Sequence, residues 1–174
     1  MSESNTPTRQ KGKLAGFTLR VFSSLYDLIM LFAVTFLFVA LPISGIEYGL
    51  GQPPADWVQK LLFIAVSFAY YVGFWYKGDG ATTGMRTWKL KLANIDTGDK
   101  PTLMASTIRF LGFGITLIAM GYTFYCLKTG NIHSMEFVFS SLLPVISLLS
   151  VMMTPQKQTL HDLIARTSVY QVLR

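Results

Sequence analysis

The most prominent feature of the sequence is a set of four long apolar runs separated by polar segments. A membrane-spanning helix needs about 20 predominantly apolar residues. Four segments meet this requirement, and we expect spans over residues 14–41, 57–76, 103–127 and 137–153. Pro144 lies in the middle of the last and shortest run, where a proline bends a helix. The pattern therefore predicts an all-α membrane protein with four transmembrane helices.

Lysine and arginine are concentrated in three polar segments: the N-terminal tail, residues 77–102 and the C-terminal tail. These segments contain Arg9, Lys11, Lys13, Lys77, Arg86, Lys89, Lys91, Lys100, Lys157, Arg166 and Arg174. Residues 42–56 contain no basic residue, and residues 128–135 contain only Lys128. Because cytoplasmic loops are enriched in Lys and Arg, this asymmetry predicts that both termini and the central segment face the cytoplasm.

Alternating polarity in the central segment indicates a strand. In RTWKLKLANID (residues 86–96), Trp88, Leu90 and Leu92 fall on one face and Lys89 and Lys91 on the other. TSVYQVLR (residues 167–174) could supply a second short strand through Val169 and Val172. We therefore expect a small cytoplasmic β ribbon beside the spans.

The chain divides into a short tail and one domain. Residues 1–13 are mostly polar, and we expect a flexible cytoplasmic tail there. Residues 14–174 form a single transmembrane domain in this interpretation. The first apolar run is longer than the hydrophobic region of a cleaved signal peptide, so we expect it to be retained.

Composition narrows the possible functions. The chain of 174 residues is 51% hydrophobic and 14% charged, whereas soluble proteins contain about 25% charged residues. Its net charge of +6 is explained by the basic segments beside the spans, so we expect a lipid bilayer as partner and no nucleic acid. Cys126 is the single cysteine, and no zinc spacing, phosphate-binding loop or nucleophile–base arrangement is present. We expect no metal, no cofactor and no enzymatic activity.

Two opposite charges, Arg20 and Asp27, interrupt the first apolar run. They are seven residues apart, so they share one helix face and lie about 10 Å apart along the axis. Arg20 can extend to the lipid headgroups or pair with an acid. A carboxylate inside a span is costly and faces the bundle interior or a wet cavity. Asp27 can therefore be a functional site or a polar clamp to another helix.

Three further residues could act together with Asp27. Arg109 lies two turns into the third run, at a depth where it can pair with Asp27 or extend to the headgroups. In TLHDLIART, Thr159 and Asp162 have the spacing of a capping box at a helix start. His161, between them, could titrate near neutral pH or be purely structural.

Three blocks of the sequence together resemble the RDD family of small bacterial and archaeal membrane proteins. These blocks are AGFTLRVFSSLYDLIML, GATTGMRTWKLKLANIDTGDKPTL and TLHDLIARTSVY. The resemblance implies that Arg20, Asp27 and Asp162 are the arginine and the two aspartates that name the family. It also implies that Gly84 and Arg86 match a Gly–x–Arg pair, although Met85 occupies a position that is often basic. For some members the resemblance implies transport, including cation/proton antiport.

Two functions remain open from the sequence. The first is transport, in which Asp27 binds a proton or monovalent cation, Arg20 or Arg109 tunes its pKa, and Asp162 gates access. A chain with four spans is small for this task, so we expect a homo-oligomer or a partner membrane protein. The second is a non-transport accessory or assembly factor for another membrane complex, with structural charges. In either case the bacterial cytoplasmic (inner) membrane is the expected location.

Overall fold

Four helical segments of the computed structural model, which describes residues 12–172, are long and apolar enough to cross a membrane. They cover Phe17–Leu50, Asp56–Tyr76, Leu103–Thr129 and Met135–Met153. The prediction of four spanning helices is confirmed. The last helix continues through Pro144. The orientation across the bilayer and the cytoplasmic position of the ribbon stay predictions from the charge asymmetry.

The first span extends further than the sequence predicts. It consists of α1 (Phe17–Thr35), a π-helical segment η1 (Phe36–Ala40) and α2 (Leu41–Leu50), and it ends at Gly51 with φ of 73°. The expected loop over residues 42–56 is therefore wrong as far as Leu50. Pro42 does not end the helix because it lies in the first turn of α2, directly after the π-helical segment, where its missing N–H is tolerated.

The other spans begin and end at residues suited to helix boundaries. They are α3 (Asp56–Tyr76), α5 (Leu103–Thr129) and α6 (Met135–Met153). The hydroxyl of Thr102 accepts a hydrogen bond from the Ala105 N–H, and the hydroxyl of Ser134 accepts one from the Phe137 N–H. Gly130, with φ of 73°, ends α5 in the left-handed conformation that favours glycine.

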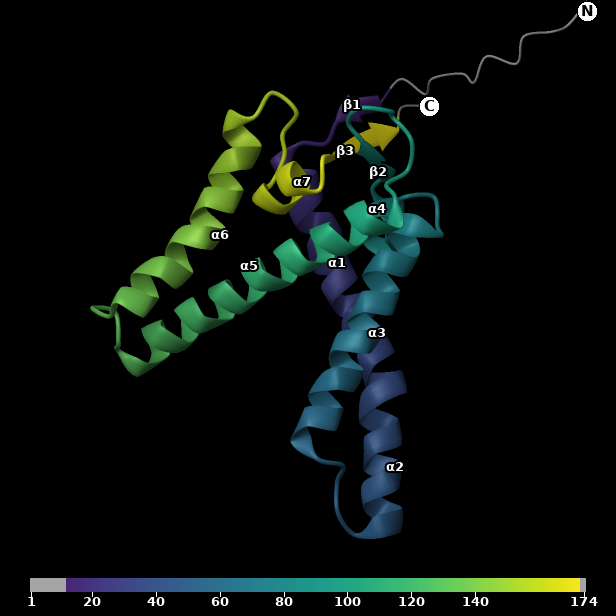
Figure 1. Cartoon of the computed structure of the whole chain (residues 1–174), viewed down its shortest axis with the longest axis vertical. Coiled ribbons are helices and arrows are strands. Elements are labelled where there is room, and N and C mark those ends of the chain that lie inside the picture. The colour runs from purple at the N-terminus through teal and green to yellow at the C-terminus, as the bar shows by residue number, and fades with distance from the viewer. Residues whose placement is uncertain (1–11, 173–174) are drawn as a thin grey trace, which may run out of the picture.

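A three-stranded antiparallel sheet lies at one end of the helices (Figure 1). Its strands are β1 (Gly12–Leu14), β2 (Leu90–Asn94) and β3 (Thr167–Val172), in the order β1-β3-β2. The two expected strands are present, with Leu92 opposite Val169. The first is shorter than predicted, because Arg86 and Thr87 belong to a short helix and the strand begins after Trp88, at Leu90. Residues 173–174 of the second expected strand lie outside the described chain. The third is an addition, because the backbone of Gly12 and Lys13 pairs with β3. The predicted flexible tail over residues 1–13 therefore overlaps β1 at these two residues, and its residues 1–11 lie outside the described chain.

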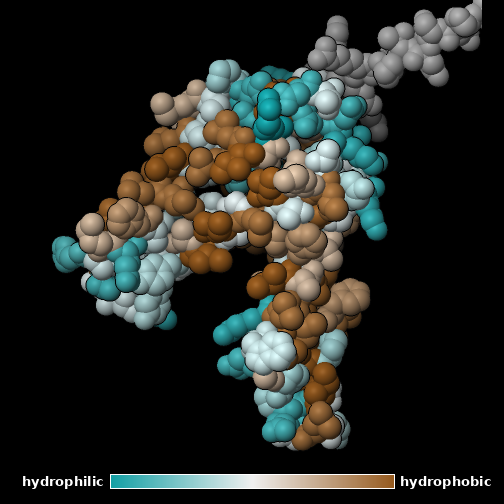
Figure 2. All heavy atoms as spheres, viewed as in Figure 1, coloured by the Kyte–Doolittle hydropathy of each residue, from teal (hydrophilic) through white to brown (hydrophobic). Residues whose placement is uncertain are grey.

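The buried core joins the sheet to the adjacent ends of the spans. Leu90 and Leu92 of β2 and Val169 of β3 are buried, together with Ala15 and the α3 residue Trp75. Away from the sheet, the α1–α3 pair and the α5–α6 pair diverge as two arms (Figure 1). In the view of Figure 2, hydrophobic side chains cover much of both arms, and hydrophilic ones gather around the sheet and at the far ends of the arms. This distribution fits a protein surrounded by lipid.

Two short helices connect the sheet to the spans. Helix α4 (Thr83–Thr87) lies between α3 and β2, and α7 (Leu160–Ile164) lies between α6 and β3. Helix α4 contacts α1, whereas α7 contacts α5 and α6. These contacts place both short helices against the ends of the spans, where the buried polar residues are found.

Candidate functional site

Asp162 is the centre of a buried charge cluster. Its side chain is 0% exposed, and its two oxygens face different guanidinium groups. Arg20 Nη1 donates to Asp162 Oδ2 at 2.7 Å, and Arg109 Nη1 forms an ion pair with Asp162 Oδ1. One carboxylate thus neutralises only one of two buried cations, which leaves the three side chains with a positive balance.

The cluster joins segments from both ends of the chain and its middle. Arg20 lies in the first turn of α1, Arg109 in the second turn of α5, and Asp162 is the third residue of α7. The Thr159 N–H donates to Asp162 Oδ2 at 3.3 Å. The capping box predicted from Thr159 and Asp162 is therefore present. Asp162 thus caps the start of α7 and also forms ion pairs with the arginines of two spans.

Other groups complete part of the hydrogen bonding of the two arginines. Arg109 Nη1 donates to Thr167 Oγ1 at 3.3 Å, and its guanidinium carbon lies 4.8 Å from the Trp75 ring centroid, a cation–π geometry. Arg20 Nε donates to the Ala15 carbonyl at 3.4 Å. Within residues 12–172, the buried atoms Arg20 Nη2 and Arg109 Nε have no hydrogen-bond partner. The cluster therefore keeps two unused donors.

Asp27 forms a separate buried site with neutral partners. Its side chain accepts hydrogen bonds from Tyr70 Oη at 2.9 Å, from Thr82 Oγ1 at 2.5 Å and from the Gly84 N–H at 2.8 Å. Asp27 is 4% exposed. Three donors around one carboxyl group suit its ionised form, which accepts hydrogen bonds only. This arrangement also fastens α4 to the first and second spans.

The structure overturns the expected pairing of Asp27 with an arginine. Among the described residues, Asp27 forms no ion pair, because Arg20 and Arg109 both face Asp162. For both arginines the sequence left open extension to the headgroups or pairing with an acid, and the structure shows pairing, with Asp162 as the acid. Arg109 is 7% exposed and is therefore buried in the protein. The depth argument from the sequence correctly placed Arg109 near the other charges, but the acid that it pairs with is Asp162 and not the candidate Asp27.

Gly84 and Arg86, the other residues suggested by resemblance, have different environments. Gly84 packs so closely on α1 that an added Cβ would overlap the Ser23 carbonyl oxygen and lie 2.9 Å from Asp27 Cγ. Arg86 is exposed, and its guanidinium carbon lies 5.5 Å from the Phe74 ring centroid. Gly84 thus belongs to the Asp27 site, whereas the structure does not bring Arg86 into either cluster.

His161 lies beside the charge cluster as a neutral side chain. Its Nε2 is 2.9 Å from Thr159 Oγ1, and its Nδ1 is buried without a hydrogen-bond partner among residues 12–172. Burial and the nearby positive charges of Arg109 and Arg20 lower the pKa of His161 well below its usual value. An imidazole in this position stays uncharged near neutral pH.

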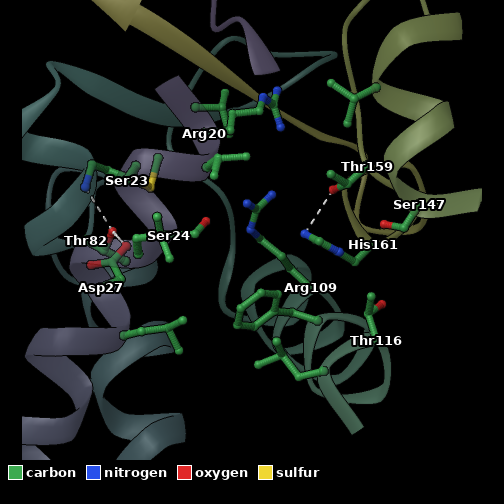
Figure 3. A pocket seen from close by; sticks show the side chains of 18 of the residues that line it. Arg20, Ser23, Ser24, Asp27, Thr82, Arg109, Thr116, Ser147, Thr159 and His161 are labelled. Atoms are coloured by element: carbon green, nitrogen blue, oxygen red, sulfur yellow. Dashed lines mark hydrogen bonds between the residues drawn. The ribbon is translucent and has the colours of Figure 1, made fainter. Parts of the chain in front are cut away.

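A cavity of about 410 Å³ connects the two sites. Figure 3 shows Asp27 and Thr82 on one side of it and Arg109 and His161 on the other. Its walls come from helices α1, α3, α4, α5, α6 and α7 and from strands β2 and β3, and they are largely apolar. No group of three His, Cys, Asp or Glu side chains that could hold a metal ion occurs within residues 12–172. The cavity can therefore offer a ligand the carboxylate of Asp27, which has no basic partner among the described residues, together with unused guanidinium donors and an apolar surface.

Sequence reasoning missed three residues that define these sites. Tyr70 and Thr82 bind Asp27, and Trp75 packs on Arg109. Thr82 could have been found, because its spacing before Met85 fits a helix cap, and its hydroxyl does accept from the Met85 N–H. Trp75 carries no such signal, since tryptophan near a span end is expected at any membrane interface. Tyr70 carries none either, because it is an uncharged residue within an apolar run.

The four spans and the buried charges between them define a multi-pass membrane protein. The model of the RDD family matches residues 14–166, so the chain belongs to the RDD family. The resemblance seen in the three sequence blocks is thereby confirmed. No curated protein and no solved structure matches the chain.

Proposed function

We propose that this protein exchanges a monovalent cation for a proton across the bacterial cytoplasmic membrane, as a transporter rather than an enzyme. The observation that carries the proposal is Asp27: a buried carboxyl group inside a span, without a basic partner among the described residues, on the wall of a cavity. An acid in this position is costly unless a ligand uses its charge. A proton and a small cation are the ligands that neutralise it.

The groups around Asp27 suit both ligands. The hydroxyls of Tyr70 and Thr82 donate to the carboxylate, but each oxygen also has lone pairs. After rotation of the hydroxyl hydrogens, these oxygens and the carboxylate could together face a small cation. Oxygen ligands are those preferred by hard cations. Asp27 would then bind either a proton or a cation, which is the requirement for exchange.

Asp162 has a different role in this proposal. Two guanidinium groups already compensate its charge, so a cation would find no free carboxylate there. We propose that the Arg20–Asp162–Arg109 cluster holds the sheet end of the bundle closed. Opening of this cluster would give Asp27 access to the cytoplasm, consistent with the orientation indicated by the basic segments.

We propose that the transporting unit is a homo-oligomer. One chain supplies four spans, and the α1–α3 and α5–α6 pairs diverge away from the sheet (Figure 1). A second copy could complete the wall of a pathway that one chain leaves open. Light scattering of the purified protein, corrected for bound detergent, should give a mass above that of one chain. A monomeric mass would contradict this part of the proposal.

The decisive experiment measures ion-driven proton flux. Purified protein in liposomes with an internal pH-sensitive dye is exposed to a gradient of Na⁺, K⁺ or Li⁺. We expect proton movement with at least one ion, loss of that movement in Asp27→Asn, and no change in Asp99→Asn, which removes an exposed loop carboxylate. Absence of flux with all three ions would overturn the exchange function. Full flux in Asp27→Asn would overturn the role of Asp27.

A second function, an accessory or assembly factor for another membrane complex, is favoured by a different observation. Asp27 fastens α4 to the spans and Asp162 fastens α7, so both acids have a packing role. In this case wild-type liposomes would show no flux. The same Asp27→Asn variant would instead lose stability, and the partner complex would fail to assemble in cells that produce it.

A further inference from the structure

The cavity between the spans has one polar, cationic end and one apolar end. Arg20, Arg109, Thr159 and His161 line the end beside the sheet (Figure 3). Beyond them, the lining residues of α1, α5 and α6 are mostly apolar: Leu25, Leu28, Phe113, Leu117, Met120 and Leu148. From Arg109 to Met120 the axial rise along α5 is about 16 Å at 1.5 Å per residue. This separation of polarity matches an amphiphile rather than a small polar solute.

The cationic end has hydrogen-bonding capacity that the protein does not use. Arg20 Nη2 and Arg109 Nε are buried without partners among residues 12–172. Leaving a buried donor unpaired is costly, and more so when the donor is charged. Arg109 is more than nine-tenths buried and lies on the cavity wall. These atoms therefore point to a ligand that supplies acceptor oxygens.

The charge balance favours an anion at this end. Asp162 offsets one of the two guanidinium groups, and burial keeps His161 neutral. Asp27 also lies on the cavity wall, but about 10 Å further along α1 than Arg20, and its oxygens accept from Tyr70, Thr82 and Gly84. An anionic group beside the two arginines would complete the local charge balance. Phosphate suits two guanidinium groups because its oxygens can accept from both.

We propose that the cavity binds an anionic phospholipid of the surrounding bilayer. The phosphate would accept hydrogen bonds from Arg20 and Arg109, and one acyl chain would lie along Leu117 and Leu148. The cavity of about 410 Å³ holds only part of such a lipid, and the rest would stay in the bilayer. This inference rests on the arginines and the apolar wall, and it is independent of ion exchange at Asp27.

The test compares lipids of equal chain length but different charge. Delipidated protein in a neutral detergent is titrated with phosphatidylglycerol or phosphatidylcholine, and bound lipid is counted by native mass spectrometry. We expect one retained phosphatidylglycerol per chain and at least about tenfold weaker retention of phosphatidylcholine. Phosphatidylcholine has the same phosphate, but its quaternary ammonium adds a positive charge beside two guanidinium groups of which Asp162 offsets only one. Equal retention of the two lipids would overturn the proposal.

Variants separate the two ends of the site. Arg20→Gln should weaken retention of phosphatidylglycerol by about tenfold. Arg166→Gln removes the same charge from an exposed pair with Asp96 and should leave retention unchanged. Leu117→Trp keeps every charge but fills the apolar part of the cavity, so it should weaken retention even if Arg20→Gln fails to fold. Unchanged retention in Leu117→Trp would overturn the assignment of the cavity.

A competition experiment with inorganic phosphate distinguishes a lipid site from a site for a free anion. Inorganic phosphate shares the headgroup chemistry but lacks the acyl chain. At millimolar concentration it should not displace phosphatidylglycerol from the wild-type protein. Displacement at concentrations similar to those of the lipid would show a site for soluble phosphate and would overturn the assignment of a lipid.

Discussion

Arg20 in the first turn of α1 donates to Asp162 in α7 at 2.7 Å, across 142 positions of the chain. Arg109 in α5 binds the other oxygen of the same carboxylate. Asp162 therefore ties the first span and the third span to a short helix that follows the last span. Because the cluster is buried, removing one of its charges leaves another charge buried without a partner, which costs far more than breaking an ion pair at the surface.

Asp162→Asn should destabilise the protein by about 3–5 kcal/mol, because it leaves two buried guanidinium groups without a counter-charge. Asparagine still accepts a hydrogen bond from the Thr159 N–H, so the loss reports on charge rather than on the helix cap. Arg20→Gln should cost less, since it leaves the balanced pair of Arg109 and Asp162. Thermal unfolding in detergent measures both effects.

Asp96→Asn is the matched control for this prediction. Asp96 pairs with Arg166 at 2.9 Å, but the two side chains are 49% and 72% exposed. An exposed ion pair contributes about 0–1 kcal/mol, so this variant should melt close to the wild type. An Asp162→Asn variant that melts with the control would show that the cluster does not hold the fold together.

Gly84→Ala should detach α4 from the first span. The added Cβ would overlap the Ser23 carbonyl oxygen and press against Asp27, so the helix must move and the hydrogen bond from the Gly84 N–H must lengthen. We expect a loss of about 1–3 kcal/mol, as for other overpacked sites. Hydrogen–deuterium exchange should become faster across Thr83–Thr87.

Gly73→Ala tests whether the loss at Gly84 comes from close packing. Gly73 lies within α3, and an added Cβ there would meet no atom within 4 Å. Alanine also favours a helix by about 0.5–1 kcal/mol over glycine. Gly73→Ala should therefore equal or exceed the wild type in stability. Similar losses in both variants would contradict the close approach of α4 to α1.

The spans could be predicted from the sequence because long apolar runs have one solution in a bilayer. The residues at which the spans begin and end were harder to predict. The first span was expected to end at residue 41, yet the helix continues through a π-helical segment and past Pro42 to Leu50. β1 was missed because its three residues, GKL, are too few to show an alternation of polar and apolar positions. Its pairing with β3 exists only in the folded chain.

The partners of Asp27 could not be predicted for a different reason. Among charged residues, Arg20 and Arg109 were the natural candidates by depth, but two of the three partners are neutral hydroxyl groups, 43 and 55 positions away. The third is a backbone N–H, which no side-chain pattern indicates. Asp162 was recognised as a helix cap, and its second task, binding both arginines, depends on the arrangement of three helices.

Gly112→Ala should loosen the contact between α5 and α7. An added Cβ at Gly112 would lie 2.8 Å from the Cβ of His161. Because neither atom belongs to the flexible end of a side chain, the helices must separate, with an expected loss of about 1–3 kcal/mol. The same change at Gly114, where an added Cβ meets nothing within 4 Å, should be harmless. Thermal unfolding of the two variants would contradict the prediction if their midpoints coincide.

The protein should lose stability as the pH falls below about 6.5, and His161 should cause part of this loss. The pKa of His161 is lowered in the folded state by burial and by the charges of Arg109 and Arg20. An unfolded histidine has a pKa of about 6.5, so between the two values the unfolded state binds more protons. Stability then rises with pH in this window and is lost as acid protonates the unfolded imidazole.

His161→Gln removes this proton linkage while keeping a polar side chain beside Thr159. The wild type should lose up to about 1.4 kcal/mol per pH unit through His161 below pH 6.5, the limit for one proton. The variant should show a shallower slope between pH 6.5 and 5, measured by chemical unfolding in detergent. Both slopes also contain contributions from carboxylates, which cancel in the difference. Identical slopes would mean that His161 accepts a proton as readily in the folded protein as in the unfolded chain, which its position beside two arginines opposes.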